Sequence, residues 1–487
     1  LSGEAYYRLY QADYMRDGYF WQTAGWFVER CRAIMKRREE QRKMDELAVW
    51  LQEHEAQMIE DIGGLVGIES VADENGFAAC CQAMEQMAGY AGRDGMETTR
   101  HEDYCISITM GSGEKEIGIW NHLDVVPAEG NWLYPPFAMQ AKNGFLIGRG
   151  VQDNKGPAVV AYYAMRYLRE KGLLQNIRVR QILGVREEVG MEDVMHYVNH
   201  YKVPDYSFVA DCGFPVCCGE KGICRVELET EAVLGQFLRL EGGTVCNSVP
   251  EHAVAELLLQ GKKMEVEGVG VSGHAAAPEG TVNAVGVLAD RLPMELLEEK
   301  ERRAALFLKE AASDGYGEGL GIACADALSG RLTCNAGVVK LKKGRISLVL
   351  DIRYPVTMES SRFMPKLQEK AKQAGYRITA VQDSAPCYRD KEDPLVTVLM
   401  NAWTQETGQT GEPFVMGGGT YARHIPNAVA FGPGMSRDYT AAGLPEGHGN
   451  CHCADEAESV ENLKCAVRIY VRALLGLDRW LGEKEEK

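Results

Sequence analysis

Apolar positions along this chain first follow a helical period and then a strand-like one. Residues 44–64 carry apolar side chains at helical spacing, and residues 77–90 repeat that pattern. Strand-like apolar runs follow at residues 104–110 and 116–120. The pattern therefore predicts two helices followed by two strands, and the second strand leads directly into a group of polar residues.

Beyond residue 156 the predicted strands and helices alternate. Gly156-Pro157 opens a predicted helix over residues 158–171, because proline suits the first turn of a helix. The pattern then predicts a strand, a helix and a strand, at residues 178–183, 193–200 and 207–210. Such alternation is typical of an α/β layer, here with a mainly parallel sheet and flanking helices.

A different pattern occupies residues 225–385. Short strands are predicted there with helices between them: strands at 224–229, 264–271, 337–342 and 347–351, and helices at 283–290 and 296–312. From residue 394 the earlier pattern returns, with a helix at 394–407, a strand at 428–431 and a last helix at 460–475. We therefore predict four parts: a helical extension at 1–45, a catalytic α/β domain at 46–224 and 386–487, and an inserted α+β lid domain at 225–385.

The first 45 residues admit two interpretations. Tyr6, Tyr7, Tyr10 and Tyr14 recur at helical spacing, and a charged run follows at residues 36–43. The residues form either amphipathic helices that pack their aromatic side chains on the main body, or a helix that docks on a partner or a membrane surface. The mixed signs of the charged run favour the first interpretation.

Charge and cysteine content narrow the class of protein. The chain has 53 Lys and Arg against 70 Asp and Glu, a net charge of −17, and no basic block interleaved with aromatic residues. This composition argues against a nucleic-acid partner. No apolar run approaches the ~20 residues that cross a bilayer, so we expect no membrane partner. The 15 cysteines form no paired CxxC motif, and no secretory signal is present, so we expect reduced thiols and a cytoplasmic protein.

Histidines and acidic residues occur where predicted strands end. His122 and Asp124 project the same way from the end of one strand, and Asp153 follows in a turn bracketed by glycines. An isolated pair of this kind is often only hydrogen-bonded near the surface. Further acidic and imidazole groups occur at other predicted strand ends or near the C-terminus: Glu187, Glu188, Asp211 and His452. Since active sites of open α/β sheets lie at strand ends, we expect these groups to meet there.

Two imidazoles and several carboxylates suit a pair of divalent metal ions. Zn²⁺ favours this mixture of ligands, and Mn²⁺ is the alternative if oxygen ligands dominate. A hydrolytic centre with two ions needs one carboxylate to bridge them and a further base for the attacking water.

Ten motifs, in order, resemble those of a known family of hydrolases: HLDVVP, GNWLYPPF, GRGVQDNKGP, EEVGMED, ADCGFP, GGTVCNSVP, GHAAAPEGTVNA, DIRYP, GGGTYAR and HCADE. The chain resembles the co-catalytic zinc aminopeptidase-like metallopeptidases, which include aminoacylases, carboxypeptidase G and dipeptidases. It is most similar to the peptidase V (PepV-type) dipeptidases. The likeness covers about residues 46–480.

The resemblance implies a role for each candidate ligand. His122 and Asp211 would hold one ion, and His452 and Glu188 would hold the other. The carboxylate of Asp153 would bridge the two ions. Asp124 would orient His122 through its other ring nitrogen. Glu187 would be the general base that takes a proton from metal-bound water and gives it to the leaving amine.

The resemblance also implies roles for residues of the lid domain and of one glycine loop. His274 would stabilise the oxyanion, Asn247 would help to position the scissile group, and Arg353 would bind the α-carboxylate of the substrate. Gly418 and its neighbours would let backbone approach the same end of the substrate. Since the large lid would supply His274 within one chain, a monomer is implied.

The implied function is a dipeptidase that acts on dipeptides or short peptides with a free C-terminal carboxylate. The alternative on the same scaffold is an N-acyl-amino-acid or succinyl-diaminopimelate deacylase. A third interpretation, a catalytically inactive binding or scaffold protein, predicts loss of ligands or base, yet Glu187 and the five ligands are all present.

Some residues depart from the family pattern. Asn154 stands where the family usually has a second acid after the bridging aspartate. Cys212, Cys451 and Cys453 flank ligands and could bind metal, but we interpret them as small buried fillers. His448 competes with His452 as a ligand, although only HCADE matches the family pattern. The GxGxxG at residues 268–273 precedes no predicted helix, so it does not indicate a dinucleotide site.

Overall fold

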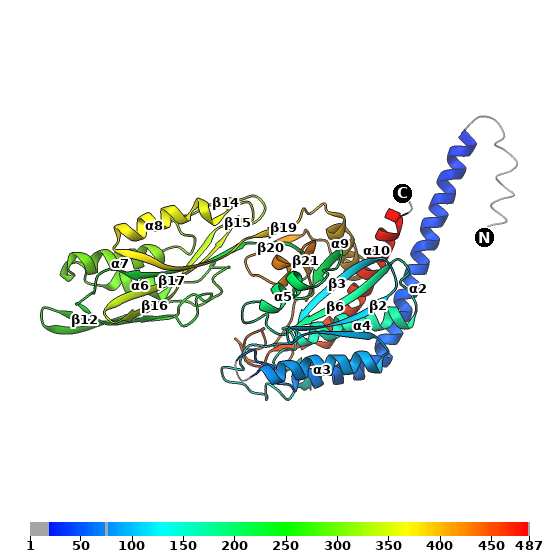
Figure 1. Ribbon diagram of the computed structural model, residues 1–487, viewed down its shortest axis with the longest axis horizontal. Coiled ribbons are helices and arrows are strands. Elements are labelled where there is room, and N and C mark those ends of the chain that lie inside the picture. Colours follow the sequence, from blue (N-terminus) through cyan, green and yellow to red (C-terminus); the bar gives the residue numbers. More distant parts are fainter. Residues whose placement is uncertain (1–18, 74–75, 486–487) are drawn as a thin grey trace. The chain divides into compact units, whose positions relative to one another are not determined.

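The computed structural model describes residues 19–73 and 76–485 (Figure 1). The chain separates into two compact units, with the boundary between Glu60 and Asp61. Helix α2 (Tyr19–Val66) crosses that boundary, and its charged run includes an i,i+4 ion pair of Lys43 with Glu39 at 3.1 Å. The tyrosines expected on a helix at residues 6–14 lie outside the described residues. Among the described residues, no helix is long and apolar enough to span a membrane.

The catalytic layer is a mixed sheet of nine strands. Its order is β1 (Glu97–His101), β2 (Cys105–Gly111), β6 (Ile177–Gly184), β3 (Lys115–His122), β7 (Tyr206–Val209), β21 (Ala428–Phe431), β9 (Val216–Glu220) and β19 (Cys387–Tyr388), with β20 (Phe414–Met416) also paired to β9. The central strands β6, β3, β7 and β21 pair in parallel, whereas β1, β2 and β19 pair antiparallel with their neighbours. The predicted α/β class is confirmed, with parallel pairing concentrated at the centre of the sheet.

Helices cover both faces of this sheet, which explains the continuous apolar run of β3. On one face, Gln181 of β6 donates to the carbonyl of Ala158 in α4 at 2.8 Å. On the opposite face, the Trp120 ring packs edge-on against the Tyr197 ring of α5, with 5.1 Å between the ring centroids. The helices of the layer are α3 (Phe77–Arg93), α4 (Lys155–Glu170), α5 (Glu192–His200), α9 (Pro394–Thr407), η3 (Tyr421–His424) and α10 (Val460–Glu485).

Two small sheets complete the catalytic layer. One consists of β4 (Gln140–Lys142), β5 (Phe145–Ile147) and β23 (Ala457–Ser459), and the other of β8 (Cys212–Gly213) and β22 (Pro433–Gly434). The first of these sheets brings the segment after residue 449 beside the segment before Gly148, because the Gly148 N–H donates to the carbonyl of Glu456 at 2.8 Å. Segments far apart in the sequence are thereby fixed together.

The lid is a seven-stranded antiparallel sheet with three helices on one face (Figure 1). Its strands, in order, are β13 (Lys262–Val269), β12 (His252–Leu259), β11 (Phe237–Gly242), β16 (Thr333–Lys342), β17 (Arg345–Tyr354), β10 (Gly222–Thr230) and β18 (Tyr376–Ser384). Its helices are α6 (Ala284–Arg291), α7 (Glu299–Ala311) and α8 (Met364–Gln373), and its shorter elements are η1 (Met294–Leu296), η2 (Ser360–Arg362), β14 (Ala325–Asp326) and β15 (Gly330–Arg331).

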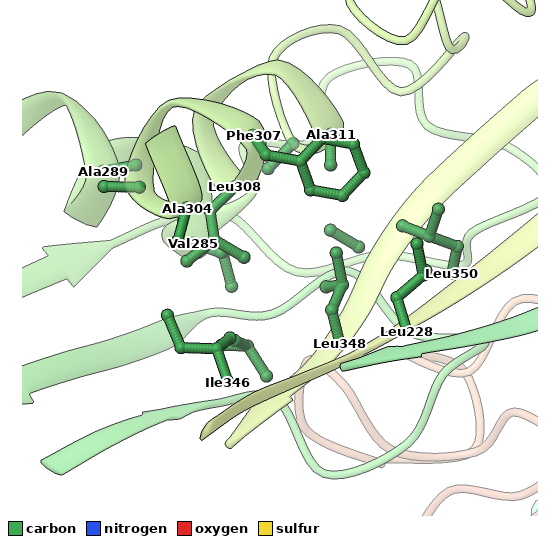
Figure 2. Close-up of a cluster of buried hydrophobic side chains, with 14 of the residues drawn as sticks. Leu228, Val285, Ala289, Ala304, Phe307, Leu308, Ala311, Ile346, Leu348 and Leu350 are labelled. Carbon is green, nitrogen blue, oxygen red and sulfur yellow. The ribbon is translucent and has the colours of Figure 1, made fainter. Parts of the chain in front are cut away.

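A separate hydrophobic core holds the lid together. Figure 2 shows Phe307 and Leu308 of α7 above Ile346 and Leu348 of β17. All four side chains are at most 1 % exposed. Burying a side chain of this size contributes about 1.5–3 kcal/mol, so this core supplies much of the stability of the lid.

The chain enters and leaves the lid at neighbouring points. It enters through Lys221, between β9 and β10, and returns from β18 into β19. Cys387 of β19 pairs with Glu220 of β9, so the two crossings run side by side. The Glu220 carboxylate also accepts hydrogen bonds from the Thr420 N–H and hydroxyl at 3.0 and 2.7 Å. The crossing is therefore tied to the loop that follows β20.

Candidate metal centre

His122 is the last residue of β3 and is fully buried. Its ring Nδ1 lies 3.0 Å from the carbonyl oxygen of Asp124 and 3.4 Å from the carboxylate Oδ1 of the same residue. Its Nε2 lies 2.9 Å from Asp153 Oδ1 and 3.7 Å from Asp211 Oδ2. The ring is thus held through one nitrogen and presents the other to two carboxylates, as a metal-ligating histidine must.

Asp153 lies in the turn between β5 and α4 and faces two imidazoles. Its Oδ1 faces His122 Nε2 at 2.9 Å, and its Oδ2 faces His452 Nε2 at 3.0 Å. A carboxylate that offers one oxygen to each of two imidazole sites has the arrangement required of a bridging ligand.

Asn154 serves the site as a neutral donor. Its Nδ2 donates to Asp211 Oδ1 and to the Ala210 carbonyl, each at 2.8 Å, and its Oδ1 accepts from Asn121 Nδ2 at 2.7 Å. The side chain is fully buried. An amide at this position can donate to the carboxylate of Asp211, which an ionised acid cannot do. Asn154, which stands where the family usually has a second acid, therefore orients Asp211 by a hydrogen bond.

Glu187 and Glu188 lie in the turn after β6. Their N–H groups donate to the two oxygens of the Asp124 carboxylate, at 3.2 and 3.1 Å. Glu188 Oε1 lies 3.2 Å from His452 Nε2. Asp124 was predicted to contact His122. Its carboxylate has a second role, because it also holds the backbone of Glu187 and Glu188.

The loop with His452 is fastened to the Asp153 turn by Glu456. The Glu456 carboxylate accepts from Arg149 Nη1 at 2.6 Å and from the N–H groups of Gly150 and Gln152 at 3.0 and 2.9 Å. His452 itself has a left-handed backbone with φ of 62°. The loop thus places His452 at the cluster.

The competing histidine is engaged elsewhere. His448 Nδ1 lies 2.6 Å from Asp455 Oδ2, and that carboxylate is fully buried. Asp455 also accepts from the N–H groups of Leu133 and Tyr134. Among the described residues, His452 and not His448 therefore contacts Asp153 and Glu188.

The cluster fits divalent cations. In each of two groups, single donor atoms lie within 4.8 Å of one another: His122, Asp153 and Glu188, and His122, Glu187 and Asp211. Burial, with the Asp211 and Glu188 carboxylates nearby, raises the pKa of Glu187 well above its usual range. Burial and Asp153 likewise raise the pKa of Asp211 to about 7. Such crowding of partly buried carboxylates is costly unless a cation neutralises it.

The surrounding carboxylates favour the protonated, positively charged form of the two histidines of the cluster. Although burial lowers the pKa of His122, contacts with Asp124 and Asp153 raise it well above its usual range. Contacts with Asp153 and Glu188 raise the pKa of His452 to about 12. Without a metal ion, protons on these rings take the place of the cation.

We expect the metal-free protein to lose stability as pH rises from about 5 to about 9. The raised pKa of Asp211 costs stability as pH rises towards 7, because the unfolded state ionises first. The raised pKa of His452 also makes the stability fall as pH rises. The contacts of protonated His452 stabilise the fold fully only below the pKa of an unperturbed histidine, and this stabilisation decreases at higher pH. Thermal unfolding of chelator-treated protein measures this, and added metal should restore more stability at the higher pH. A metal-free melting temperature that rises over this range would contradict the expectation.

The lid contributes His274 from a loop that contacts the glycine loop. His274 is exposed, and its Nδ1 accepts the Ala276 N–H at 3.1 Å. A Cβ added to Gly417 would lie 2.7 Å from Ala276 Cβ, so glycine is required for this close approach. The exposed Asn247 is adjacent, since its carbonyl accepts the N–H of Ala275 at 2.9 Å.

Arg353 is held by its own strand. Its Nε and Nη2 donate to the two oxygens of Asp351 at 2.5 and 2.8 Å, and its Nη1 donates to the Gly417 carbonyl at 3.1 Å. Gly418 is half-buried, and a Cβ there would find its nearest atom, Met416 Sδ, at 3.9 Å. The structure thus brings Arg353 and the glycine loop together, and packing demands glycine at 417 rather than at 418.

The cysteines near the ligands differ in exposure. Burial raises the pKa of the Cys212 thiol well above its usual range, so the thiolate that a metal requires is disfavoured. Cys453 is half-buried, but Cys451 is exposed, so our interpretation of Cys451 as a buried filler is wrong. A position beside a metal ligand does not bury Cys451, because the neighbouring His452 is itself exposed.

Two buried acids of this site were missed from the sequence. Glu456 is the last residue of HCADE, and Asp193 is the last residue of EEVGMED. Both are fully buried. Their place inside matching motifs was the available signal, because buried acids need partners.

Comparison with known proteins agrees with this geometry. Residues 118–476 match the model of peptidase family M20/M25/M40. A protein named putative dipeptidase from Staphylococcus epidermidis is 30% identical over 475 residues, which cover 87% of this chain and 98% of the relative. The Beta-Ala-Xaa dipeptidase of Lactobacillus delbrueckii subsp. lactis is 28% identical over 461 residues, covering 87% and 96%.

Solved structures share the fold. Human carnosine dipeptidase 1 is similar with a TM-score of 0.56 at 16% identity, covering 89% of this chain and 98% of that one. The dipeptidase Dug1p of Saccharomyces cerevisiae is similar with a TM-score of 0.55 at 14% identity, covering 88% and 97%. At these identities the likeness concerns the fold alone.

Proposed function

Because the chain belongs to peptidase family M20/M25/M40, we propose that it is a metal-dependent dipeptidase for substrates with a free C-terminal carboxylate. One observation carries this proposal. The Asp153 carboxylate faces His122 and His452, one with each oxygen, at 2.9 and 3.0 Å. The dipeptidase names of the relatives from Staphylococcus epidermidis and Lactobacillus delbrueckii support the choice of substrate.

Two divalent ions fit the donor set, with Zn²⁺ preferred for its imidazole and carboxylate ligands and Mn²⁺ as the alternative. The residues that would hold them are His122 and Asp211 for one ion, His452 and Glu188 for the other, and Asp153 for both. When bound, such ions supply Lewis acidity, which polarises a peptide carbonyl and lowers the pKa of water.

Glu187 is the proposed general base. Its donor atom lies within 4.8 Å of those of His122 and Asp211, so it reaches the cluster without being needed as a ligand. It would take a proton from the attacking water and deliver it to the leaving amine. Burial is the main cause of the raised pKa of Glu187, and a raised pKa suits a group that must hold a proton between these steps.

His274 is the proposed donor to the developing oxyanion. Because its Nδ1 accepts the Ala276 N–H, the neutral ring carries its proton on Nε2. Although the His274 ring remains accessible to solvent, its partial desolvation and the nearby Arg353 lower its pKa, which favours this neutral form. An N–H on an exposed loop beside the glycine loop can meet a substrate carbonyl.

Arg353 is the proposed site for the C-terminal carboxylate. Asp351 occupies the edge formed by Nε and Nη2, and Gly417 takes one N–H of Nη1. A guanidinium has five N–H groups, so one on each Nη remains for a substrate carboxylate. Asp351 fixes the plane of that fork.

The protein is proposed to act as a cytoplasmic monomer. The lid supplies His274 and Arg353 within the same chain, so no second copy is needed to complete the site. The cysteines of the described side chains are free, which suits a reducing compartment.

Three matched substrates test the function: a dipeptide, the same dipeptide amidated at its C-terminus, and an N-acylated amino acid. We expect the free dipeptide to be hydrolysed with Zn²⁺ or Mn²⁺, and the amide to lose at least about tenfold in kcat/KM, because it forfeits a charged hydrogen bond. Faster hydrolysis of the N-acylated amino acid would make the protein a deacylase. No hydrolysis of dipeptides with either metal would refute the proposal.

A further inference from the structure

Four consecutive backbone N–H groups of the turn at residues 185–188 donate to two carboxylates. Asp193 Oδ2 accepts the N–H groups of residues 185 and 186 at 2.7 and 2.8 Å. Asp124 accepts those of residues 187 and 188 at 3.2 and 3.1 Å. Both acids are fully buried. The backbone that carries the proposed base is therefore held at every N–H by a buried charge.

Asp193 is itself fixed from two sides. The Tyr421 hydroxyl donates to Asp193 Oδ2, and the Val194 N–H donates to Oδ1 at 2.8 Å. The approach is close, because a Cβ added to Gly184 would lie 2.1 Å from the Tyr421 hydroxyl and 2.3 Å from Asp193 Oδ2. Packing leaves Asp193 little room to move, so its position defines that of the turn.

Within the part of the chain that the structure describes, the hydrogen bonds of Asp193 lead only to this turn, to Val194 of its own helix and to Tyr421. A buried N–H that loses its acceptor must find another, so weakening Asp193 would let residues 185 and 186 shift. Glu187 follows directly, and a displacement of about 1 Å at a catalytic group can cost as much as a hundredfold in rate.

We propose that Asp193, held by Tyr421, is a positioning residue that fixes the orientation of Glu187. This inference rests on the proposed function, in which Glu187 is the base. Among the described residues, Asp193 makes no hydrogen bond to a side chain of a candidate ligand or of a residue proposed to bind substrate. Its loss should therefore lower kcat and leave KM and metal content near their original values.

Tyr421→Phe and Asp193→Asn test the proposal, with Tyr470→Phe as the matched control. Tyr421 and Tyr470 are both buried, and the Tyr470 hydroxyl donates to the Phe431 carbonyl at 2.9 Å, away from the turn. Asp193→Asn keeps the shape of the side chain, but one end of an amide is a donor and would meet N–H groups. The measurements are kcat and KM on a dipeptide with saturating metal, metal ions per chain, and melting temperature.

We expect kcat to fall about tenfold for Tyr421→Phe and up to about a hundredfold for Asp193→Asn, as for partners that orient a metal site. KM should stay within about twofold and metal content should be unchanged. Tyr470→Phe should keep its kcat while showing a similar change in melting temperature. If Asp193→Asn fails to fold, Tyr421→Phe decides alone.

Three results would overturn the proposal. The first is a Tyr421→Phe variant whose kcat equals that of Tyr470→Phe. The second is a kcat that falls only in proportion to metal content, which would assign the network to Glu188. The third is a raised KM with unchanged kcat, which would assign Tyr421 to the neighbouring glycine loop. An unmodified protein without dipeptidase activity would instead refute the proposed function, so the two failures are distinct.

Discussion

The Glu187→Gln variant is expected to lose about a thousand- to ten-thousandfold in kcat while it keeps its fold and its metal ions. Glutamine has the shape of glutamate, but its amide cannot take up the proton of the attacking water. The backbone N–H of residue 187 would still donate to Asp124. Removing one charge from a crowded group of carboxylates also reduces repulsion, so the melting temperature should not fall.

Glu192→Gln provides the control for this experiment. Glu192 is exposed and lies four residues beyond Glu188, at the start of α5. The Glu192→Gln substitution changes the same functional group near the turn without touching the cluster, so kcat should stay within about twofold of that of the unmodified protein. Full activity of Glu187→Gln would show that another group is the base. Parallel loss of metal and activity would show that Glu187 is a ligand.

Removal of metal ions is expected to abolish activity, and substitution of the bridge should have a larger effect than that of any other ligand. Asp153→Asn replaces the carboxylate that faces both imidazoles, so it should release both ions. Asp211→Asn affects a carboxylate that faces one of the two imidazoles, that of His122 at 3.7 Å, so it should release one ion. The measurement is metal content per chain by mass spectrometry after gel filtration.

Restoration separates these effects from misfolding. Protein treated with a chelator should regain activity on addition of Zn²⁺ or Mn²⁺, since its ligands remain in place. Neither aspartate variant should regain full activity in this way. Undiminished activity after thorough chelation, or equal metal content in the two variants, would contradict the assignment of Asp153 as the bridge.

The central elements of the fold could be predicted from the sequence because they are buried. β3 and α4 lie within the layer, and their apolar residues form long runs. β18 was not predicted, since it is an edge strand of the lid and every residue from Arg377 to Asp383 is at least partly exposed. β11 and β12 were also missed, although both lie inside the lid sheet and carry a buried face. The alternation of buried with more exposed residues along β12 was an available strand signal.

The candidate site divides in the same way. Residue types and motif order suffice to propose His122, Asp153 and His452, because metal chemistry demands those side chains. The role of Asn154 was not predictable, since it depends on which atoms its amide meets in the folded chain. Asp193 was missed for a related reason. It binds backbone N–H groups, and their direction is set only once the turn has formed.

The neighbouring crossings into and out of the lid bear on how the chain folds as it is synthesised. The strands of the lid, β10 to β18, form one uninterrupted segment and become complete before the catalytic sheet does. That sheet needs β21, which pairs with β7 across the whole length of the insertion. During vectorial synthesis the lid can therefore fold while strand β7 still lacks its neighbour, and a chaperone would find its exposed edge at that stage. His452 also follows the insertion in the chain, so the candidate metal centre can assemble only after the lid segment has been synthesised.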